Sequence, residues 1–374
     1  MTLTEEFRSC WFIATFGCIL YIAGTAVLFW NEGRAVHHMV SLDEALDAAI
    51  SLHINEEIPS SYDGRIVHIK GPIIVGEPLT APEYEIQVLA VKLKRRVQMY
   101  QWVEESMEHN GDVFAPIHTV SRSYYYVTEW RDDLVDSHSF YIQTGHYNPH
   151  HFPIESETQI ADAAYIGYFE LGQELKDKFT NCVELTSDTR PEDPSIKMHQ
   201  GMYYHSNDIF NPEIGDIRLL FSVAGQEGEL YTVVGKLENK KIVPYESSRG
   251  CKILLLYPGE LNLMEVFRRE HHAQRMTTWG YRFMGWVLVF FGVTCTSTLL
   301  HIMLSQVRIL SAMAPDPEFP VGANIILSFS LALLIASIAW VLHRPFIGVA
   351  LLFAAASPFL WCVRSLADYQ RVVF

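Results

Sequence analysis

Histidines are the residues of this chain best suited to chemistry, because an imidazole ring binds metal ions and exchanges protons near neutral pH. The 374-residue sequence contains 16 of them. Two groups stand out, one in a proline-containing loop and one after a glutamate: His138, His146, His150, His151 and, with Glu270, His271 and His272. The spacings H-E-x-x-H, H-x-x-E-H and C-x-x-C are absent from the sequence. We therefore interpret these histidines as solvated or hydrogen-bonded and predict no metal site.

Nucleophilic chemistry has no better support in the sequence. Cys182 has only Lys176 and Lys178 nearby to activate it. There is no G-x-S-x-G elbow, phosphate-binding loop or dinucleotide fingerprint. We predict no catalytic residue, no cofactor-binding residue and no cofactor, and expect a protein that is not an enzyme. A disulfide between Cys182 and Cys251 would need an oxidising compartment, and the spacing does not decide it.

Two functional alternatives stay open beside this interpretation. A membrane-associated enzyme or lipid-handling protein would use a His/Asp-lined pocket, for example one built from His138, His146 and Asp162. A channel-forming oligomer would use the hydroxyl-rich residues 294–298. We favour helix–helix contact for these hydroxyls, because small polar residues are typical of packed membrane helices.

Four long apolar runs are the most prominent elements of the chain that could position a site. They cover residues 11–30, 283–307, 321–342 and 346–363. A helix needs roughly 20 residues to cross a bilayer core, so each run is a candidate membrane span. His301 is the notable ionisable residue within them, whereas transporters and proton relays usually carry charged groups at depth. The first run continues past the small residues near Gly24, so we favour a retained anchor over a cleaved signal peptide.

The polar segment between the first two runs, residues 31–278, has its own charge and its own pattern. It carries 38 acidic and 22 basic residues out of 43 and 28 in the chain, a formal charge of −16. Such a balance argues against nucleic acid or anionic lipid as the partner of this segment as a whole. Arginines near the ends of the apolar runs favour a cytoplasmic location for this segment. However, long loops cross membranes largely regardless of charge, so counting arginines does not decide on which side the segment lies.

Strands dominate this segment, with a few helices. A capping box from Ser41 to Glu44 predicts a short helix separate from the first span, after a polar stop at residues 31–36. Strands are expected at 65–69, ending before Gly71-Pro72, and at 217–223, 230–237, 242–243 and 253–257. Residues 88–103 and 123–130 predict a long hairpin, and a helix is expected near 171–179. Residues 186–197 form a candidate subdomain boundary.

Two basic runs have competing interpretations. Lys92, Lys94, Arg95 and Arg96 resemble a nuclear localisation signal, but their alternation with apolar residues favours a charged strand face. A helix from Leu261 carries Arg268, Arg269 and Arg275 into the second apolar run. We interpret it as a juxtamembrane helix with arginines near lipid headgroups, and a regulatory lipid-binding site is the alternative.

Several short segments, taken in order, resemble the transmembrane protein 43 (LUMA) family along nearly the whole chain. They are FWNEGRA (29–35), GRIVHI (64–69), AVKL (90–93), MYQWVE (99–104), TEWR (128–131), GH (145–146), NP (148–149), YHS (204–206), GDIR (215–218), EVFRRE (265–270), TWG (278–280) and RP (344–345). The resemblance implies a multi-pass scaffold of the endoplasmic reticulum and inner nuclear membrane that contributes to nuclear-envelope organisation. It also implies self-association and binding to emerin-like and lamin-associated proteins, with no catalytic residues to carry over.

Together, these observations predict an α+β membrane protein with four transmembrane helices and a strand-rich lumenal or perinuclear domain. Its parts would be an N-terminal tail (1–10), a first span (11–30), the large domain (31–278), three further spans (283–307, 321–342 and 346–363) and a C-terminal tail (364–374). The expected partners are membrane lipids, a second copy of the chain and the nuclear-envelope proteins named above, but no nucleic acid.

Overall fold

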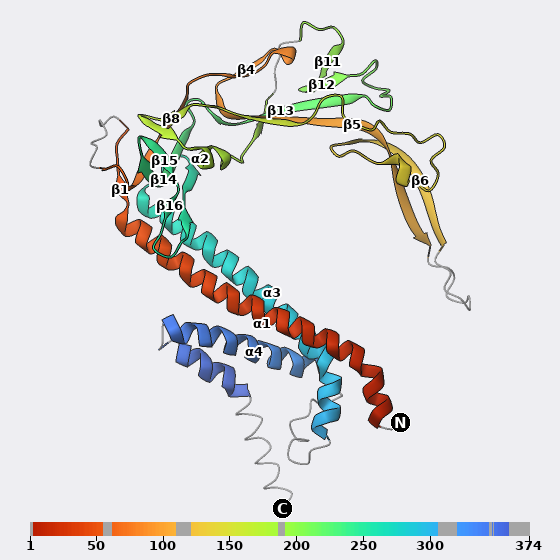
Figure 1. Cartoon of the computed structure of the whole chain (residues 1–374), viewed down its shortest axis with the longest axis vertical. Coiled ribbons are helices and arrows are strands. Elements are labelled where there is room, and N and C mark those ends of the chain that lie inside the picture. The colour runs from red at the N-terminus through yellow and green to blue at the C-terminus, as the bar shows by residue number, and fades with distance from the viewer. Residues whose placement is uncertain are drawn as a thin grey trace, which may run out of the picture. The chain divides into compact units, whose positions relative to one another are not determined.

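The computed structural model describes residues 3–54, 62–109, 121–185, 191–305, 320–343, 346 and 348–358. These residues form two compact units. A helical unit contains residues 1–47, 246–251 and 264–374, and a strand-rich unit contains residues 48–245 and 252–263. Figure 1 labels the elements of both. The prediction of a mixed α+β protein with a strand-rich middle is confirmed.

The helical unit contains three long helices: α1 (Leu3–Ala48), α3 (Leu263–Ser305) and α4 (Pro320–His343). Figure 1 shows α1 and α3 side by side. The prediction of a polar stop followed by a separate helix is wrong, because α1 runs unbroken through residues 31–36. Asn31 and Glu32 are buried there and bonded to α3, so these polar residues do not end the helix.

The residues of the predicted capping box have a different role. Ser41 accepts a hydrogen bond of 2.8 Å from the Ser247 hydroxyl, and Glu44 accepts one of 3.0 Å from the Ser248 backbone N–H. Both acceptors therefore hold the segment 246–251 against the side of α1 instead of starting a helix.

Glycines allow α1 and α3 to approach closely. A Cβ atom on Gly24 would lie 2.9 Å from the Gly285 carbonyl oxygen, and one on Gly292 would lie 2.7 Å from the Tyr21 nitrogen. Thr296 lies at the same contact, with its methyl group 2.9 Å from a Cβ built on Gly17. This confirms helix–helix contact for that part of the hydroxyl-rich segment, as expected where small residues let helix backbones meet.

One helical segment among the described residues, Trp11–Ala48 within α1, is long and apolar enough to cross a membrane. Two shorter apolar helices cover Asn324–Ile338 and Gly348–Pro358. The four-span prediction is therefore supported for the first span only. The predicted C-terminal tail (364–374) lies outside the described residues, and so do residues 306–319 between α3 and α4.

The strand-rich unit begins with a small closed barrel. Its strands are β2 (Ile66–Val75), β8 (Ala164–Ile166), β9 (Phe169–Leu171), β15 (Lys241–Val243) and β14 (Leu230–Glu238). They pair in that order, and β14 also pairs with β2, which closes the ring. Two more strands extend it, β1 (Ile50–Ser51) beside β2 and β18 (Leu255–Pro258) beside β14.

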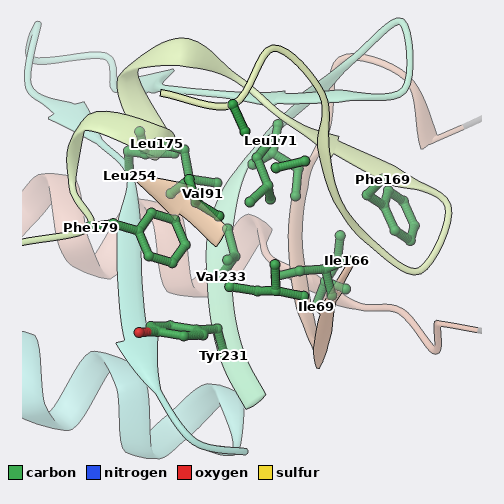
Figure 2. Close-up of a cluster of buried hydrophobic side chains, with 14 of the residues drawn as sticks. Ile69, Val91, Ile166, Phe169, Leu171, Leu175, Phe179, Tyr231, Val233 and Leu254 are labelled. Carbon is green, nitrogen blue, oxygen red and sulfur yellow. The ribbon is translucent and has the colours of Figure 1, made fainter. Parts of the chain in front are cut away.

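An aliphatic and aromatic core fills this barrel (Figure 2). Val233, Ile69 and Ile166 are fully buried, and Phe179 lies against Tyr231 with ring centroids 4.9 Å apart. The helix predicted near 171–179 is α2 (Gln173–Asp177), which contributes Leu175 to the core. The predicted end of strand β2 before Gly71-Pro72 is wrong, because β2 continues to Val75. It is paired with β14 as far as Pro72 and with β8 from Ile73 to Val75.

A second sheet has the order β11 (Ile196–His199), β12 (Met202–His205), β13 (Ile217–Gln226), β5 (Ala90–His109) and β6 (Ser121–Arg131). Strand β7 (Glu157–Ile160) also pairs with β5, and β10 (Val183–Glu184) pairs with β13. The predicted long hairpin is confirmed as β5–β6, in register from Met99↔Arg131 to His109↔Ser121. The predicted boundary at 186–197 is described only from residue 191, and its last residues belong to β11.

Short elements complete the unit. They are β3 (Leu79–Ala81), β4 (Ile86–Val88), β16 (Tyr245–Glu246), β17 (Lys252–Ile253) and two 3₁₀ turns, Pro82–Tyr84 and Ser137–Ser139. The strand predicted at 253–257 is divided at Leu254 between β17 and β18.

Candidate functional site

The helical unit has a buried ion pair at the end of the apolar part of α1. Glu32 is only 1% exposed. Its carboxylate accepts two hydrogen bonds from the Arg282 guanidinium, at 2.6 and 2.8 Å, and one from the Trp340 indole at 3.1 Å. A bidentate carboxylate–guanidinium pair is strong and directional. One acidic side chain of α1 therefore joins α3 and α4.

Aromatic rings surround this ion pair. The Arg282 guanidinium carbon lies 5.0 Å from the Trp279 ring centroid and 5.9 Å from that of Trp340. One residue before Glu32, the Asn31 amide donates to the Thr278 carbonyl at 3.1 Å. Asn31 and Glu32, which interrupt the apolar part of α1, are thus both hydrogen-bonded to the neighbouring helices, as most buried polar groups are.

A cleft of about 510 Å³ opens beside the ion pair. Its apolar wall comes from α1, its polar wall from α3 and one ring from α4; the lining residues are Glu32, Ala35, Val36, Met39, Val40, Asp43, His271, Gln274, Arg275, Thr278, Trp279, Arg282 and Trp340. The volume lies within the range of small-molecule sites. Because an apolar wall faces charged and polar side chains, the cleft is suited to binding an amphiphilic molecule.

The predicted histidine groups separate in the structure. His271 lies in the cleft lining, with its Nε2 3.3 Å from an Asp43 carboxylate oxygen, whereas His272 is exposed. His138 stacks on His150 with centroids 5.3 Å apart, and His146 stacks on Tyr126 at 3.9 Å. No group of three potential metal ligands is gathered anywhere in the described part of the chain.

His146 belongs to a loop, residues 133–148, that buried amides fix to strand β5. Gln101 donates to the Asp133 carbonyl at 3.0 Å and accepts from the Val135 N–H at 2.9 Å. Asn148 accepts from the Trp102 N–H at 2.8 Å and donates to the Trp102 carbonyl at 2.9 Å. We call residues 133–148 the pinned aromatic loop, because it exposes large side chains from a fixed backbone: Tyr141 is 73% exposed, Tyr147 65% and Ile142 50%.

The remaining candidates have structural partners. On β5 the exposed Lys94 and Arg96 alternate with the buried Leu93 and Val97, which confirms a charged strand face, and Arg96 donates to Asp132 at 2.8 Å. Arg95 lies on the opposite face of the strand, where it pairs with Glu157 at 3.1 Å. Cys182 and Cys251 are free thiols. Asp162 is exposed, and its backbone carbonyl accepts a hydrogen bond from the buried Lys176 ammonium at 2.9 Å.

Sequence reasoning missed a buried histidine in the barrel. The Nδ1 of His68 lies 3.0 Å from the Ser51 hydroxyl, and its Nε2 lies 3.1 Å from the Leu261 carbonyl oxygen. Because a carbonyl only accepts, Nε2 carries the proton and Nδ1 accepts from Ser51 in the neutral ring. Burial lowers the pKa of His68 and keeps it neutral. His68 appeared in the sequence as part of a strand, and nothing there marked it as hydrogen-bonded at both nitrogens.

Known proteins resemble this chain over most of its length. A family model described as transmembrane protein 43 matches residues 99–345. The chain is 58% identical over 373 residues to the transmembrane protein 43 homolog of Drosophila melanogaster, covering 99% of each. It is 32% identical over 366 residues to human transmembrane protein 43, covering 92% of this chain and 88% of the human one. No solved structure matches.

The family match and the long N-terminal apolar helix agree with the resemblance seen in the short sequence segments. The family model covers the strand-rich unit from residue 99 onward and both helices that follow it. The match to the fly relative also covers the earlier residues, including α1 and the Glu32 region. This chain belongs to the transmembrane protein 43 family.

Proposed function

We propose that this protein is a multi-pass scaffold of the endoplasmic reticulum and inner nuclear membrane that recruits nuclear-envelope partners. In this proposal residues 11–30, 283–307, 321–342 and 346–363 span the membrane, and 31–278 form a lumenal or perinuclear domain. Short tails, 1–10 and 364–374, face the other side. The family is one of membrane proteins without a known catalytic role, which is consistent with a scaffold.

The distribution of aromatic residues supports the additional spans. Trp30 of α1, Trp279 of α3 and Trp340 of α4 all lie near the Glu32–Arg282 pair. Tryptophan is enriched at membrane–water interfaces, where its ring meets hydrocarbon and its N–H meets water. Residue 348 lies against Val341, so the last two apolar helices are close neighbours, as a short connection between antiparallel spans requires.

The observation that carries the recruiting role is the pinned aromatic loop. Exposed tyrosines on a fixed backbone provide contact area at low entropic cost, and such residues are enriched at protein interfaces. Tyr141 also stacks on Tyr124 of β6, with centroids 4.8 Å apart, which holds one exposed ring in place. The strand-rich unit therefore offers a preformed surface for a protein partner.

Partner capture tests this role in the full-length protein. Cells expressing the tagged chain are solubilised, and the amounts of emerin and lamin that co-purify are measured. Tyr141→Ser with Tyr147→Ser is expected to reduce capture about fivefold or more, as loss of central aromatic contacts does. Tyr168→Ser, which removes a tyrosine 62% exposed elsewhere in the same unit, is the matched control. Unchanged capture, or an equal loss with the control, would contradict the proposal.

Membrane sidedness is tested separately. An epitope inserted after Pro191, next to exposed Glu192, should be protected from protease in sealed microsomes and cleaved after detergent is added. Cleavage in intact microsomes would place the strand-rich unit on the cytoplasmic side and overturn the proposed topology.

A further inference from the structure

The cleft in the helical unit lies just beyond the proposed membrane boundary. Trp340 lies near the C-terminal end of α4, which stops at His343, and it is the single cleft-lining residue from α4 among the described residues. On α1 the lining continues from Glu32 to Asp43. These positions are 11 residues apart, or about 16 Å along a helix. The cleft therefore extends from the interfacial tryptophans into the depth occupied by lipid headgroups.

An arginine stripe lines one face of α3 beside this cleft. Arg268, Arg275 and Arg282 recur every seven residues, which returns to nearly the same helix face after two turns. Arg282 is neutralised by Glu32 and Arg268 by Glu265. For Arg275, no carboxylate among the described residues lies within 4.0 Å, so this guanidinium is the uncompensated charge of the stripe.

The other basic groups of the cleft already have carboxylate neighbours. Glu32 is bonded to Arg282 and Trp340, and Asp43 lies beside His271. The opposite wall is apolar, with Val36, Met39 and Val40 at helical i, i+3, i+4 spacing on α1. The cleft thus presents one available cation opposite an aliphatic surface.

The geometry points to a binding site for one anionic glycerophospholipid. Its phosphate would lie against Arg275, and its glycerol and first acyl carbons would lie against Val36, Met39 and Val40. Basic pockets between membrane helices bind anionic headgroups in this way, and a volume of about 510 Å³ accommodates a headgroup with the start of its chains. The inference rests on the membrane placement proposed above, but it does not depend on any protein partner.

Binding is measured by native mass spectrometry of the full-length protein in detergent. Dioctanoyl phosphatidic acid and dioctanoyl phosphatidylcholine serve as probes. We expect one phosphatidic acid per chain and weaker binding of phosphatidylcholine. Arg275→Gln should weaken phosphatidic acid binding about fivefold, the effect of one interfacial cation. Arg249→Gln, which removes another exposed arginine of the helical unit, should leave it unchanged.

Two further arms identify the ligand chemistry. Met39→Trp fills the apolar wall and should abolish the bound lipid, with helix content by circular dichroism showing that the variant folds. Inorganic phosphate at the concentration of the lipid should not compete. Competition by phosphate, equal loss with Arg249→Gln, equal binding of phosphatidylcholine, or unchanged binding by Arg275→Gln would each overturn the proposal. Because no partner protein is present, the result is independent of the capture experiment.

Discussion

The helical and strand-rich units of this protein bury polar groups for different reasons. In the helical unit a full ion pair, Glu32 with Arg282, lies between helices that otherwise meet through glycines and apolar side chains. In the strand-rich unit the buried polar residues are mostly neutral, such as His68, Gln101 and Thr232, and they are hydrogen-bonded to neighbouring backbone groups. Helices surrounded by lipid gain little from apolar burial, so close backbone contact and polar bonds must hold them together.

The two units should therefore lose stability through different kinds of substitution. The strand-rich unit is stabilised by many apolar contacts, each of which contributes a fraction of the total. The helical unit concentrates its specificity in a few residues, because removing one partner of a buried ion pair leaves an uncompensated charge. Three changes test this difference, beginning with the largest expected effect.

Glu32→Ala is expected to lower the unfolding free energy of the helical unit by about 3–5 kcal/mol, because Arg282 is left buried without its carboxylate. The measurement is denaturant unfolding in mild detergent, followed by far-UV circular dichroism. Glu265→Ala, which breaks the surface pairs with Arg268 and Arg269, should have a much smaller effect, because solvent screens such pairs. Replacing both Glu32 and Arg282 by Met should restore most of the stability, since no charge is then stranded. Equal effects of Glu32→Ala and Glu265→Ala would refute the special role of the buried pair.

Ile69→Ala should lower the unfolding free energy of the strand-rich unit by about 2–5 kcal/mol, because it leaves a cavity in the barrel core. Near-UV circular dichroism should report this loss while the far-UV helical signal persists. Ile74→Ala on the same strand is the control, since Ile74 is 44% exposed and its truncation leaves no enclosed cavity. Loss of both units at the same denaturant concentration would show that they unfold as one.

Acidification should have the smallest effect, and it should act on both units, because burial also lowers the pKa of His38 in the helical unit. Burial lowers the pKa of His68 and of His205 below the usual 6.5, so the folded state binds fewer protons than the unfolded chain. The stability that these groups contribute is complete above about pH 6.5 and falls as the pH drops below it. The loss of stability is measured as the change in melting temperature between pH 7.5 and pH 5.5. These two pH values lie about one unit above and below the usual histidine pKa.

A histidine variant sharpens this last test. His68→Gln should flatten the pH dependence, because glutamine stays neutral and its amide still donates and accepts hydrogen bonds. His272→Gln, which changes an exposed histidine of the helical unit, should leave the slope unchanged. An unaltered slope with His68→Gln would assign the pH dependence to other groups.

The sequence by itself determined the classes of element and their order. Apolar runs of spanning length, alternating strands and the β5–β6 hairpin follow from local periodicity, because one face of each element must be buried. The charged alternation at residues 92–96 likewise predicted a solvated strand face, and the exposed Lys94 and Arg96 beside the buried Leu93 and Val97 confirm it.

Only the tertiary structure decided which polar residues are buried and with what. Asn31 and Glu32 appeared to end a helix, yet their partners Thr278 and Arg282 lie 247 and 250 residues away in the chain, and those bonds let α1 continue. Tertiary contacts also decided three other features. They are the ring closure from β14 back to β2, the hydrogen bonds of His68 to Ser51 and Leu261, and the uncompensated charge of Arg275. Each depends on contacts between segments distant in sequence, which local periodicity does not encode.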